Sequence, residues 1–381
     1  MAVIYVDPLN GTDNTDSGRG ETEGTGSVSG AGAYASISYA LANYGSFSTT
    51  EGNTIKLADT AADVLTSSLD TDTSVASANA PLCIEGYHYD GSNGGTAGAL
   101  TMTLPFGNSG VTCGEIDGND AVSYLFDVNT TNTILKNLKL HSTTSYVIWF
   151  TAGSFVYDCE IYNGGSAGTA YLGSVEMAQG LYVHTDQSGG TAIFYPKLVD
   201  QCEVKGHATG CILNTGGPGG ITNSLIHGFT TIGLSIANSH ARIENNTIDG
   251  GSLTSNTEGI KWTNAAFDKA VVINNLITNC SATGCNAIEF PSGASLALLG
   301  NNAFYNNTTD ESADTPALDF DNITETSDPY TDSANDDFSL VSGALSNDAA
   351  ILTNHNRNVG AWQEKPTGGG GGGETTSVFM A

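Results

Sequence analysis

Residues 219–250 read GGITNSLIHGFTTIGLSIANSHARIENNTIDG and contain one pattern twice. In each copy an apolar residue precedes a polar pair, and a second apolar residue stands two places after that pair. The copy at Ile221–Ile226 recurs at Ile243–Ile248, 22 residues later. Self-similarity at a period of this length indicates a protein built from stacked repeats.

The pattern extends from about Thr133 to Asn306. The apolar positions after the polar pair are Leu140, Ile161, Val204, Ile226, Ile248, Ile277 and Phe304. The apolar positions five places earlier are Leu135, Val156, Val199, Ile221, Ile243, Val272 and Leu299. The polar column between them is Asn137, Asp158, Gln201, Asn223, Asn245, Asn274 and Asn301. The column beside it changes from small or apolar residues to amides and is Leu138, Cys159, Cys202, Ser224, Asn246, Asn275 and Asn302. The interval of 43 residues between Ile161 and Val204 leaves room for one long turn or two ordinary turns.

A second short strand repeats in the same order. Its copies are Gly180–Val183, Gly210–Leu213, Gly233–Ile236, Gly259–Trp262 and Ala287–Phe290. Most of these copies alternate apolar and polar residues, which is typical of a strand with one buried face.

Two short strands per turn predict a parallel β-helix, in which each coil buries its apolar strip against its neighbours. Asparagine at the turns tolerates a left-handed backbone, and its amide can bond to the asparagine of the next coil, which predicts a ladder of side chains. The alternative, a β-sandwich, does not account for seven aligned turns. We therefore expect an all-β, parallel β-helical solenoid.

The coil pattern resembles the right-handed parallel β-helices of the pectate-lyase-like superfamily, whose members include lyases, hydrolases, phage tailspikes and inert structural proteins. Residues 5–13, YVDPLNGTD, resemble the opening of such chains, in which a short helix then caps the first coil. Tyr34–Tyr44 has helical spacing and fits that cap. Residues 337–340 and 358–363 resemble the strands that close the last coil, with Trp362 as a core plug. We expect three parts: a strand and cap at 1–60, a body at 61–365, and a tether with a docking peptide at 366–381.

The balance of charges limits the partners. With 11 Lys and Arg against 40 Asp and Glu, the formal net charge is −29. Nucleic acids, anionic membranes and polyanionic sugars would be repelled, whereas divalent cations or a basic protein surface would be attracted. The N-terminus lacks the pattern of a secretory signal. Seven cysteines without metal-ligand spacing are expected to be apolar filler in a reducing cytoplasm, with a Cys280–Cys285 disulfide as a weaker alternative.

Few residues have a pattern that suggests chemistry. Arg242, Glu244 and Asp249 form the best outward cluster, although a surface ion pair is the simpler explanation of these residues. Asp7, Asn10, Asp13 and Asp16 place oxygen ligands at intervals of three and could hold Ca²⁺, although turn chemistry also explains them. His141, His184, His207 and His227 are expected to form a solvent-facing row. Tyr146, Tyr182 and Trp262 are candidates for stacking on sugars.

The C-terminus begins with six glycines, Gly368 to Gly373, which form a flexible tether. Val378, Phe379 and Met380 at its tip are predicted to dock on a partner or a sister subunit.

Together these features, with the superfamily resemblance, predict a non-enzymatic virion protein, such as a bacteriophage capsid decoration or head-fibre protein. It would be made in the host cytoplasm and bind a capsid or other virion protein, and a homotrimer is the expected assembly. The alternative is a tailspike-like or secreted protein that binds or cleaves polysaccharides, as a lyase or glycoside hydrolase.

Overall fold

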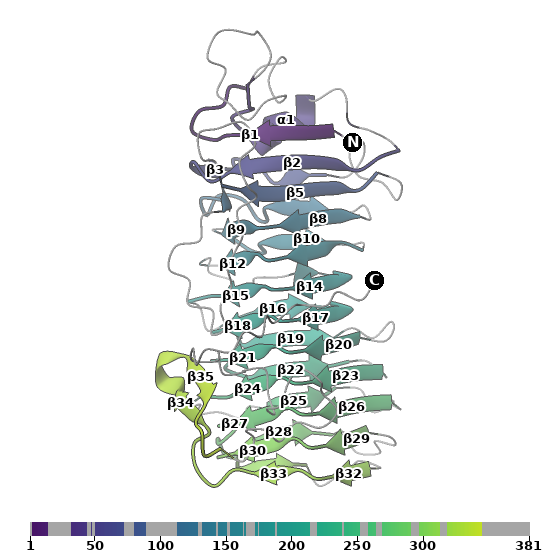
Figure 1. Ribbon diagram of the computed structural model, residues 1–381, viewed down its shortest axis with the longest axis vertical. Coiled ribbons are helices and arrows are strands. Elements are labelled where there is room, and N and C mark those ends of the chain that lie inside the picture. Colours follow the sequence, from purple (N-terminus) through teal and green to yellow (C-terminus); the bar gives the residue numbers. More distant parts are fainter. Residues whose placement is uncertain are drawn as a thin grey trace, which may run out of the picture.

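The computed structural model is a right-handed parallel β-helix in which three long sheets wrap around one core (Figure 1). The structure describes residues 2–13, 32–43, 47, 50–71, 80–88, 113–128, 132–141, 144–150, 153–162, 164, 172–173, 175–186, 189–213, 219–237, 240–251, 258–263, 269–290, 297–312 and 318–344.

Within these residues each coil from β2 to β31 contributes a strand to sheet A, then to sheet B, then to sheet C. The first strand, β1, belongs to sheet A, and the last coil ends in sheet B with β33. Sheet A contains β1 (Ala2–Val6), β2 (Asn53–Ala58), β5 (Leu82–Tyr87), β8 (Thr133–Lys136), β11 (Phe155–Tyr157), β14 (Met177–Gln179), β17 (Leu198–Asp200), β20 (Gly219–Thr222), β23 (His240–Glu244), β26 (Lys269–Ile273), β29 (Ala297–Gly300) and β32 (Leu318–Phe320). Sheet B contains β3 (Ala62–Val64), β6 (Gly114–Asp117), β9 (Leu138–His141), β12 (Glu160–Tyr162), β15 (Tyr182–His184), β18 (Glu203–Lys205), β21 (Leu225–His227), β24 (Thr247–Asp249), β27 (Leu276–Thr278), β30 (Ala303–Tyr305) and β33 (Ile323–Thr324). Sheet C contains β4 (Leu69–Asp70), β7 (Phe126–Val128), β10 (Ile148–Phe150), β13 (Leu172–Gly173), β16 (Thr191–Phe194), β19 (Thr209–Leu213), β22 (Ile232–Ile236), β25 (Glu258–Trp262), β28 (Asn286–Glu289) and β31 (Thr309–Glu311).

From β8 onward, each corner between sheets A and B contains one residue with a left-handed backbone. Asn223, Asn245 and Asn274 occupy it at φ of 51°, 56° and 58°, and the rest of the predicted polar column does the same. Asparagine, aspartate and glycine enter this region at low cost, which explains why the corner column is polar. The predicted polar column is confirmed.

The 43-residue interval between Ile161 and Val204 consists of two ordinary turns, with one further coil between these two residues. Ala178 pairs between Val156 and Val199, and Val183 pairs between Ile161 and Val204. Gly180 takes the corner at φ 64°. The prediction that Gly180–Val183 belongs with the second-strand copies was wrong, because Tyr182–His184 is a sheet B strand whereas the other four copies lie in sheet C.

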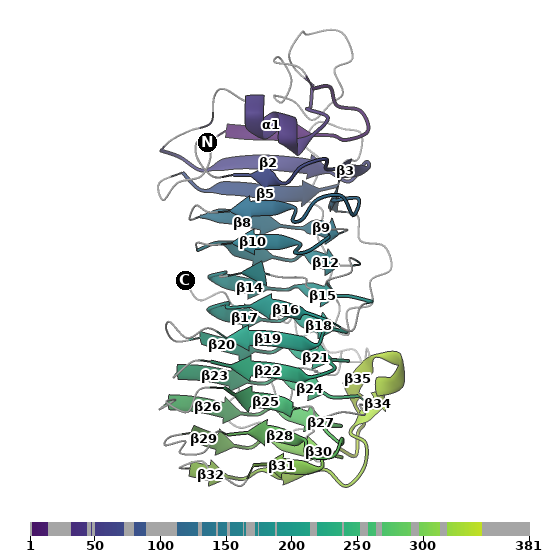
Figure 2. The same cartoon turned by 180° about the vertical axis from the view of Figure 1, so that it is seen from behind.

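The N-terminal end is capped as expected. Helix α1 (Ile37–Asn43) lies over the first coils and buries Ile37 and Ala40 against the core (Figure 2). The Asp63 carboxylate accepts a hydrogen bond from the Ile37 N–H at 2.8 Å, which anchors the start of the helix to the second coil.

The segment after β33, the last strand of sheet B, differs from the prediction. Residues 337–340 do not close the last coil: β35 (Asp337–Leu340) pairs antiparallel with β34 (Tyr330–Asp332), with a short 3-10 helix η1 (Ser333–Asn335) between them. This hairpin folds back onto the outer face of sheet B beside β21 and β24 (Figures 1 and 2). It covers outward apolar side chains that would otherwise be exposed, including Leu225, Leu276 and Ala303. Residues 358–363, with Trp362, lie outside the described residues.

Candidate functional site

The outer face of sheet A contains an open groove of about 660 Å³. It crosses β17, β20 and β23. It is lined by Lys197, Leu198, Asp200, Gly219, Gly220, Thr222, Asn223, Arg242, Glu244 and Asn245. These positions are close together because the pairing places Asp200, Thr222 and Glu244 in one outward column and Leu198, Gly220 and Arg242 in the next.

A glycine creates the hollow. Gly220 stands at an outward position between Leu198 and Arg242, where the neighbouring coils have large side chains. A Cβ at residue 220 would lie 3.0 Å from the Arg242 carbonyl oxygen and 3.7 Å from Leu198 Cδ1. The missing side chain therefore leaves a gap one strand wide in the sheet surface.

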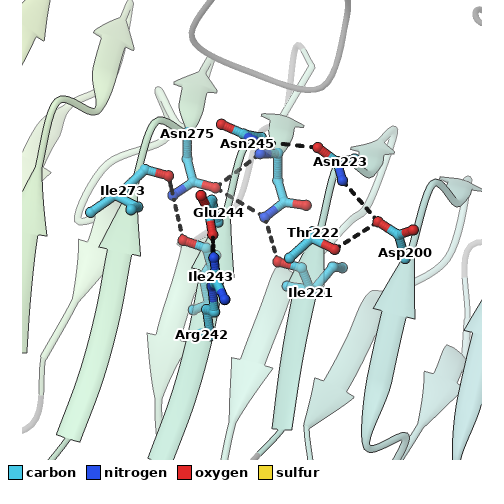
Figure 3. Close-up of polar contacts among 11 residues, drawn as sticks. Asp200, Ile221, Thr222, Asn223, Arg242, Ile243, Glu244, Asn245, Ile273 and Asn275 are labelled. Atoms are coloured by element: carbon cyan, nitrogen blue, oxygen red, sulfur yellow. Dashed lines mark hydrogen bonds and ion pairs between the residues drawn. The ribbon is translucent and has the colours of Figure 1, made fainter. Parts of the chain in front are cut away.

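Arg242 and Glu244 form one wall of the groove, as Figure 3 shows. Arg242 Nε donates to Glu244 Oε2 at 2.6 Å, and its Nη2 bonds to the same oxygen. Asp249, the third residue of the predicted cluster, does not join them. It lies on β24 in sheet B, is buried, and accepts hydrogen bonds from Thr278 and Asn279 at 2.6 Å each.

A chain of hydrogen bonds joins Asp200, Thr222, Asn223 and Asn245, which also line the groove (Figure 3). Asp200 Oδ1 accepts from Thr222 Oγ1 at 2.7 Å and from Asn223 Nδ2 at 2.8 Å, and Oδ2 accepts from Gln179 Nε2 at 3.1 Å. Asn245 Nδ2 donates to Asn223 Oδ1 at 3.4 Å. Fixed donors and acceptors of this kind suit the hydroxyl groups of a ligand.

One acceptor in this chain is unsatisfied. Among the described residues, Asn245 Oδ1 is buried without a hydrogen-bond partner, and the Asn245 side chain lines the groove. A buried acceptor that makes no hydrogen bond costs about 1–3 kcal/mol.

Sequence reasoning found Arg242 and Glu244 but missed Gly220, Asp200 and Asn245 as parts of one site. The usable signal was the Gly219–Gly220 pair, which interrupts a column that is otherwise occupied by side chains. Asn245 was assigned only a corner role, because its backbone conformation alone explains its identity.

In the predicted Ca²⁺ turn, the carboxylates of Asp7 and Asp13 accept hydrogen bonds from backbone N–H groups. Asp7 Oδ1 accepts from the N–H groups of Leu9 and Asn10 at 3.1 and 3.0 Å. Asp13 Oδ1 accepts from the N–H groups of Ala35 and Ser36 at 2.9 and 3.1 Å. These carboxylates hold the backbone ahead of α1, and Asp16 lies outside the described residues.

The other predicted candidates are dispersed. Trp262 is buried and stacks on Phe290 inside the core, so it is not available to a sugar. Tyr146 packs on Trp149 with ring centroids 5.3 Å apart. Tyr182 faces outward on sheet B. The docking residues Val378, Phe379 and Met380 lie outside the described residues.

The histidine row is only partly as predicted. His141, His184 and His227 share one outward column of sheet B, but His227 is buried rather than solvent-facing. His207 is buried and lies beyond the end of β18, outside that column.

Comparisons with known proteins identify the fold. A pectate lyase, Pel9A, superposes with a TM-score of 0.53 at 14% sequence identity, covering 96% of this chain and 97% of that chain. The chain shares the fold of that enzyme. The family model of NosD, described as a periplasmic copper-binding protein, matches residues 174–331, which include every residue that lines the groove. No curated protein matches. In the described part of the chain no helix is long and apolar enough to cross a membrane.

The residues present do not fit a copper centre. No group of three His, Cys, Asp or Glu side chains within the described residues could hold a metal ion. The thiols of Cys159 and Cys202 are core groups whose pKa is raised by burial, so they resist becoming the thiolate that metals bind. His141, His184 and His227 each bond to a glutamate instead.

Proposed function

We propose that the protein binds an extended, uncharged polysaccharide in the groove on sheet A and works outside the cytoplasm. The observation that carries this proposal is the groove at Gly220, whose lining combines fixed amide, hydroxyl and carboxylate groups. The likeness to a pectate lyase supports a polysaccharide ligand. The likeness to NosD, a periplasmic protein, supports a place outside the cytoplasm.

The chemistry of the groove favours sugars over other ligands. Amide, hydroxyl and carboxylate groups line it beside one exposed apolar side chain, Leu198. The apolar column continues from Leu198 through Met177 to Phe155, whose ring stacks on Tyr157 at 6.1 Å. An extended polymer lying across these coils would meet polar groups and ring faces in turn. A net charge of −29 disfavours polyanions.

The groove favours binding over cleavage. Hydrolysis needs two carboxyl groups, one to give and one to take a proton. Here Glu244 bonds to Arg242, and both oxygens of Asp200 already accept hydrogen bonds. These groups are arranged to hold a ligand. Release of reducing ends or unsaturated products from a bound polysaccharide would establish the enzymatic alternative.

The virion assignment gains no support from the comparisons and stays a prediction. Co-purification with an icosahedral particle would establish it. Binding to a polysaccharide would not conflict with it.

The test is affinity for neutral polysaccharides, measured by affinity electrophoresis and then by calorimetry on oligosaccharides. Asn245→Gly keeps the left-handed corner and removes an amide side chain that lines the groove, so we expect affinity about 5- to 10-fold weaker, the value of roughly one hydrogen bond. Asn301→Gly is the matched control, because Asn301 has the same backbone, at φ 52°, outside the groove. An Asn245→Gly protein that binds as well as the wild type would reject the proposal.

A further inference from the structure

The outer face of sheet B carries a repeating arrangement that the groove does not use. Two outward columns run along it. The first is Glu115, Lys139, Glu160, Tyr182 and Glu203, and the second is Asp117, His141, Tyr162, His184, Lys205 and His227. Glutamate returns in the first column at every second coil, and histidine does so in the second column.

Each histidine bonds to a glutamate of the preceding coil. The Nε2–Oε1 distance is 2.6 Å for His141 and Glu115, and 3.0 Å for His184 and Glu160. The third pair, His227 and Glu203, is at 2.9 Å. These pairs tie coils together and use one oxygen of each carboxylate. A carboxylate has about four acceptor positions, so the pairs leave acceptor capacity on that face.

Tyr182 occupies the centre of this face. In the column its strand neighbours are Glu160 on one side and Glu203 on the other, each about 4.8 Å away along the sheet. Its ring stacks on His184 with centroids 4.2 Å apart and planes at 15°, which uses one of its two faces. Tyr162 packs on the same imidazole at 4.9 Å. The result is an aromatic surface between carboxylates.

Two more carboxylates border the aromatic surface. Asp186 Oδ2 accepts from Tyr162 Oη at 2.7 Å. Asp336, in the turn of the β34–β35 hairpin, is held by Lys205 and lies 3.5 Å from His227 Nδ1. The pKa of Tyr182 is raised, first by burial and then by the charges of Glu203, Asp336, Glu160 and Asp186.

The hairpin ends the open part of the face. Phe338 packs edge-on against His227, with centroids 4.8 Å apart, and the side chains of His227 and Glu203 are only 3% and 4% exposed. The side chains of His184 and Glu160 are 20% and 14% exposed. The accessible surface is therefore centred on Tyr182, with Glu160, Asp186 and Asp336 at its border.

We propose that this surface binds an amine-bearing sugar, with the ammonium group among Glu160, Asp186 and Asp336 and the ring against Tyr182 and Tyr162. A cation on a tyrosine face contributes about 0.5–2 kcal/mol, and surrounding carboxylates add charge-assisted hydrogen bonds. A neutral sugar would gain the stacking but make no charge-assisted hydrogen bond to these carboxylates. The site needs none of the groove residues of sheet A.

The probe is a short oligomer of glucosamine, measured by calorimetry at low ionic strength, with the N-acetylated oligomer as its uncharged counterpart. We expect the amine oligomer to bind at least tenfold more tightly, and its affinity to fall several-fold when salt screens the carboxylates. A neutral oligosaccharide bound in the groove should not displace it. Equal affinity for the two oligomers overturns this inference and leaves the proposed function standing. Displacement of the amine oligomer by a neutral oligosaccharide that binds in the groove has the same consequence.

Variants place the ligand. Tyr182→Leu should weaken binding 5- to 30-fold and Tyr182→Phe less than twofold, because phenylalanine keeps the ring. Asp186→Asn removes an exposed charge without disturbing the Glu–His pairs and should weaken binding several-fold. Asn301→Gly should bind as the wild type. Unchanged binding by Asp186→Asn and Tyr182→Leu together overturns the proposal.

Discussion

Asn246 and Asn275 join successive coils through one side-chain oxygen that accepts two hydrogen bonds. Asn275 Oδ1 accepts from both the backbone N–H and the side-chain Nδ2 of Asn246, at 3.0 Å each. The same arrangement links Asn275 to Asn302, at 3.1 and 3.0 Å. Each amide also donates to a backbone carbonyl, such as that of Ile243 at 3.0 Å. The amide ladder is thus the polar interior of one corner.

Asn275→Ala should therefore destabilise the protein more than its size suggests. The change leaves the Asn246 N–H and the Ile243 carbonyl without their side-chain partner in a buried corner. Each unsatisfied buried group costs about 1–3 kcal/mol, so we expect a loss of roughly 3 kcal/mol or more.

Denaturant unfolding measures this loss. Cys159→Ala, five coils earlier in the same column, is the control and should cost about 1 kcal/mol, because a thiol makes a weak hydrogen bond. Equal losses at the two positions would contradict the role given to the ladder.

Asp63 should make stability depend on pH. Burial raises its pKa from 3.8 to about 6, although the Ile37 N–H opposes the shift. The folded state therefore holds this proton more tightly than the unfolded state. The resulting stability is complete below about pH 4 and is lost as the pH rises through 6, with a total of about 3 kcal/mol.

Asp63→Asn keeps an oxygen for the Ile37 N–H and removes the charge. At pH 7 it should be more stable than the wild type, and the advantage should disappear at pH 4. Thermal unfolding at several pH values measures the difference between the two proteins, which removes the shared effect of the −29 net charge. An advantage that does not change with pH would contradict the assignment.

The β34–β35 hairpin should open separately from the solenoid. Phe338 is buried between His227 and Tyr330, with centroids 4.8 and 5.1 Å away. Replacing it with alanine removes about 3–5 kcal/mol of packing, which exceeds what a two-stranded hairpin can lose and stay docked.

Hydrogen exchange would detect this opening. In Phe338→Ala, amides of residues 330–340 should lose protection while those of β22 and β25 keep theirs. Ser339→Ala, on the outer side of the same strand, should change little. Loss of protection throughout the solenoid would show that the hairpin is integral to the coils.

The cysteines should be unreactive in the native protein. All seven are free thiols, and six of them are buried. Burial raises the pKa of Cys113 to about 12 and that of Cys83 to about 11. Since the thiolate is the reactive form, a thiol reagent at pH 8 should modify Cys83 slowly and the others only after denaturation. Rapid modification of several thiols would contradict their burial.

The coil architecture was predictable because its signals are periodic. Columns such as Ile226, Ile248 and Ile277 repeat in type and spacing, and each is wholly buried. The coil at Ala178–Val183 gave no such signal, since Gly180 satisfies the left-handed corner without an amide. The hairpin was mistaken for a closing strand because Phe338 and Leu340 alternate as any half-buried strand does.

The groove was less predictable for a physical reason. Its hollow depends on an absent side chain at Gly220, and its unsatisfied acceptor depends on the direction of one amide at Asn245. Neither is a property of a residue type in a pattern. Arg242 and Glu244 were found because alternation along one strand places both outward, whereas Asp249 is separated from them by a corner.

From β8 onward at most two residues separate the strands at the corner between sheets A and B, so this corner leaves little slack in the chain. In these coils the variation in length lies at the other two corners, where three to nine residues separate the strands. New peptide segments grafted at those two edges would project sideways without shifting the register of any strand. The solenoid is accordingly a scaffold on which recognition loops can be exchanged one coil at a time, at a pitch fixed by the sheet.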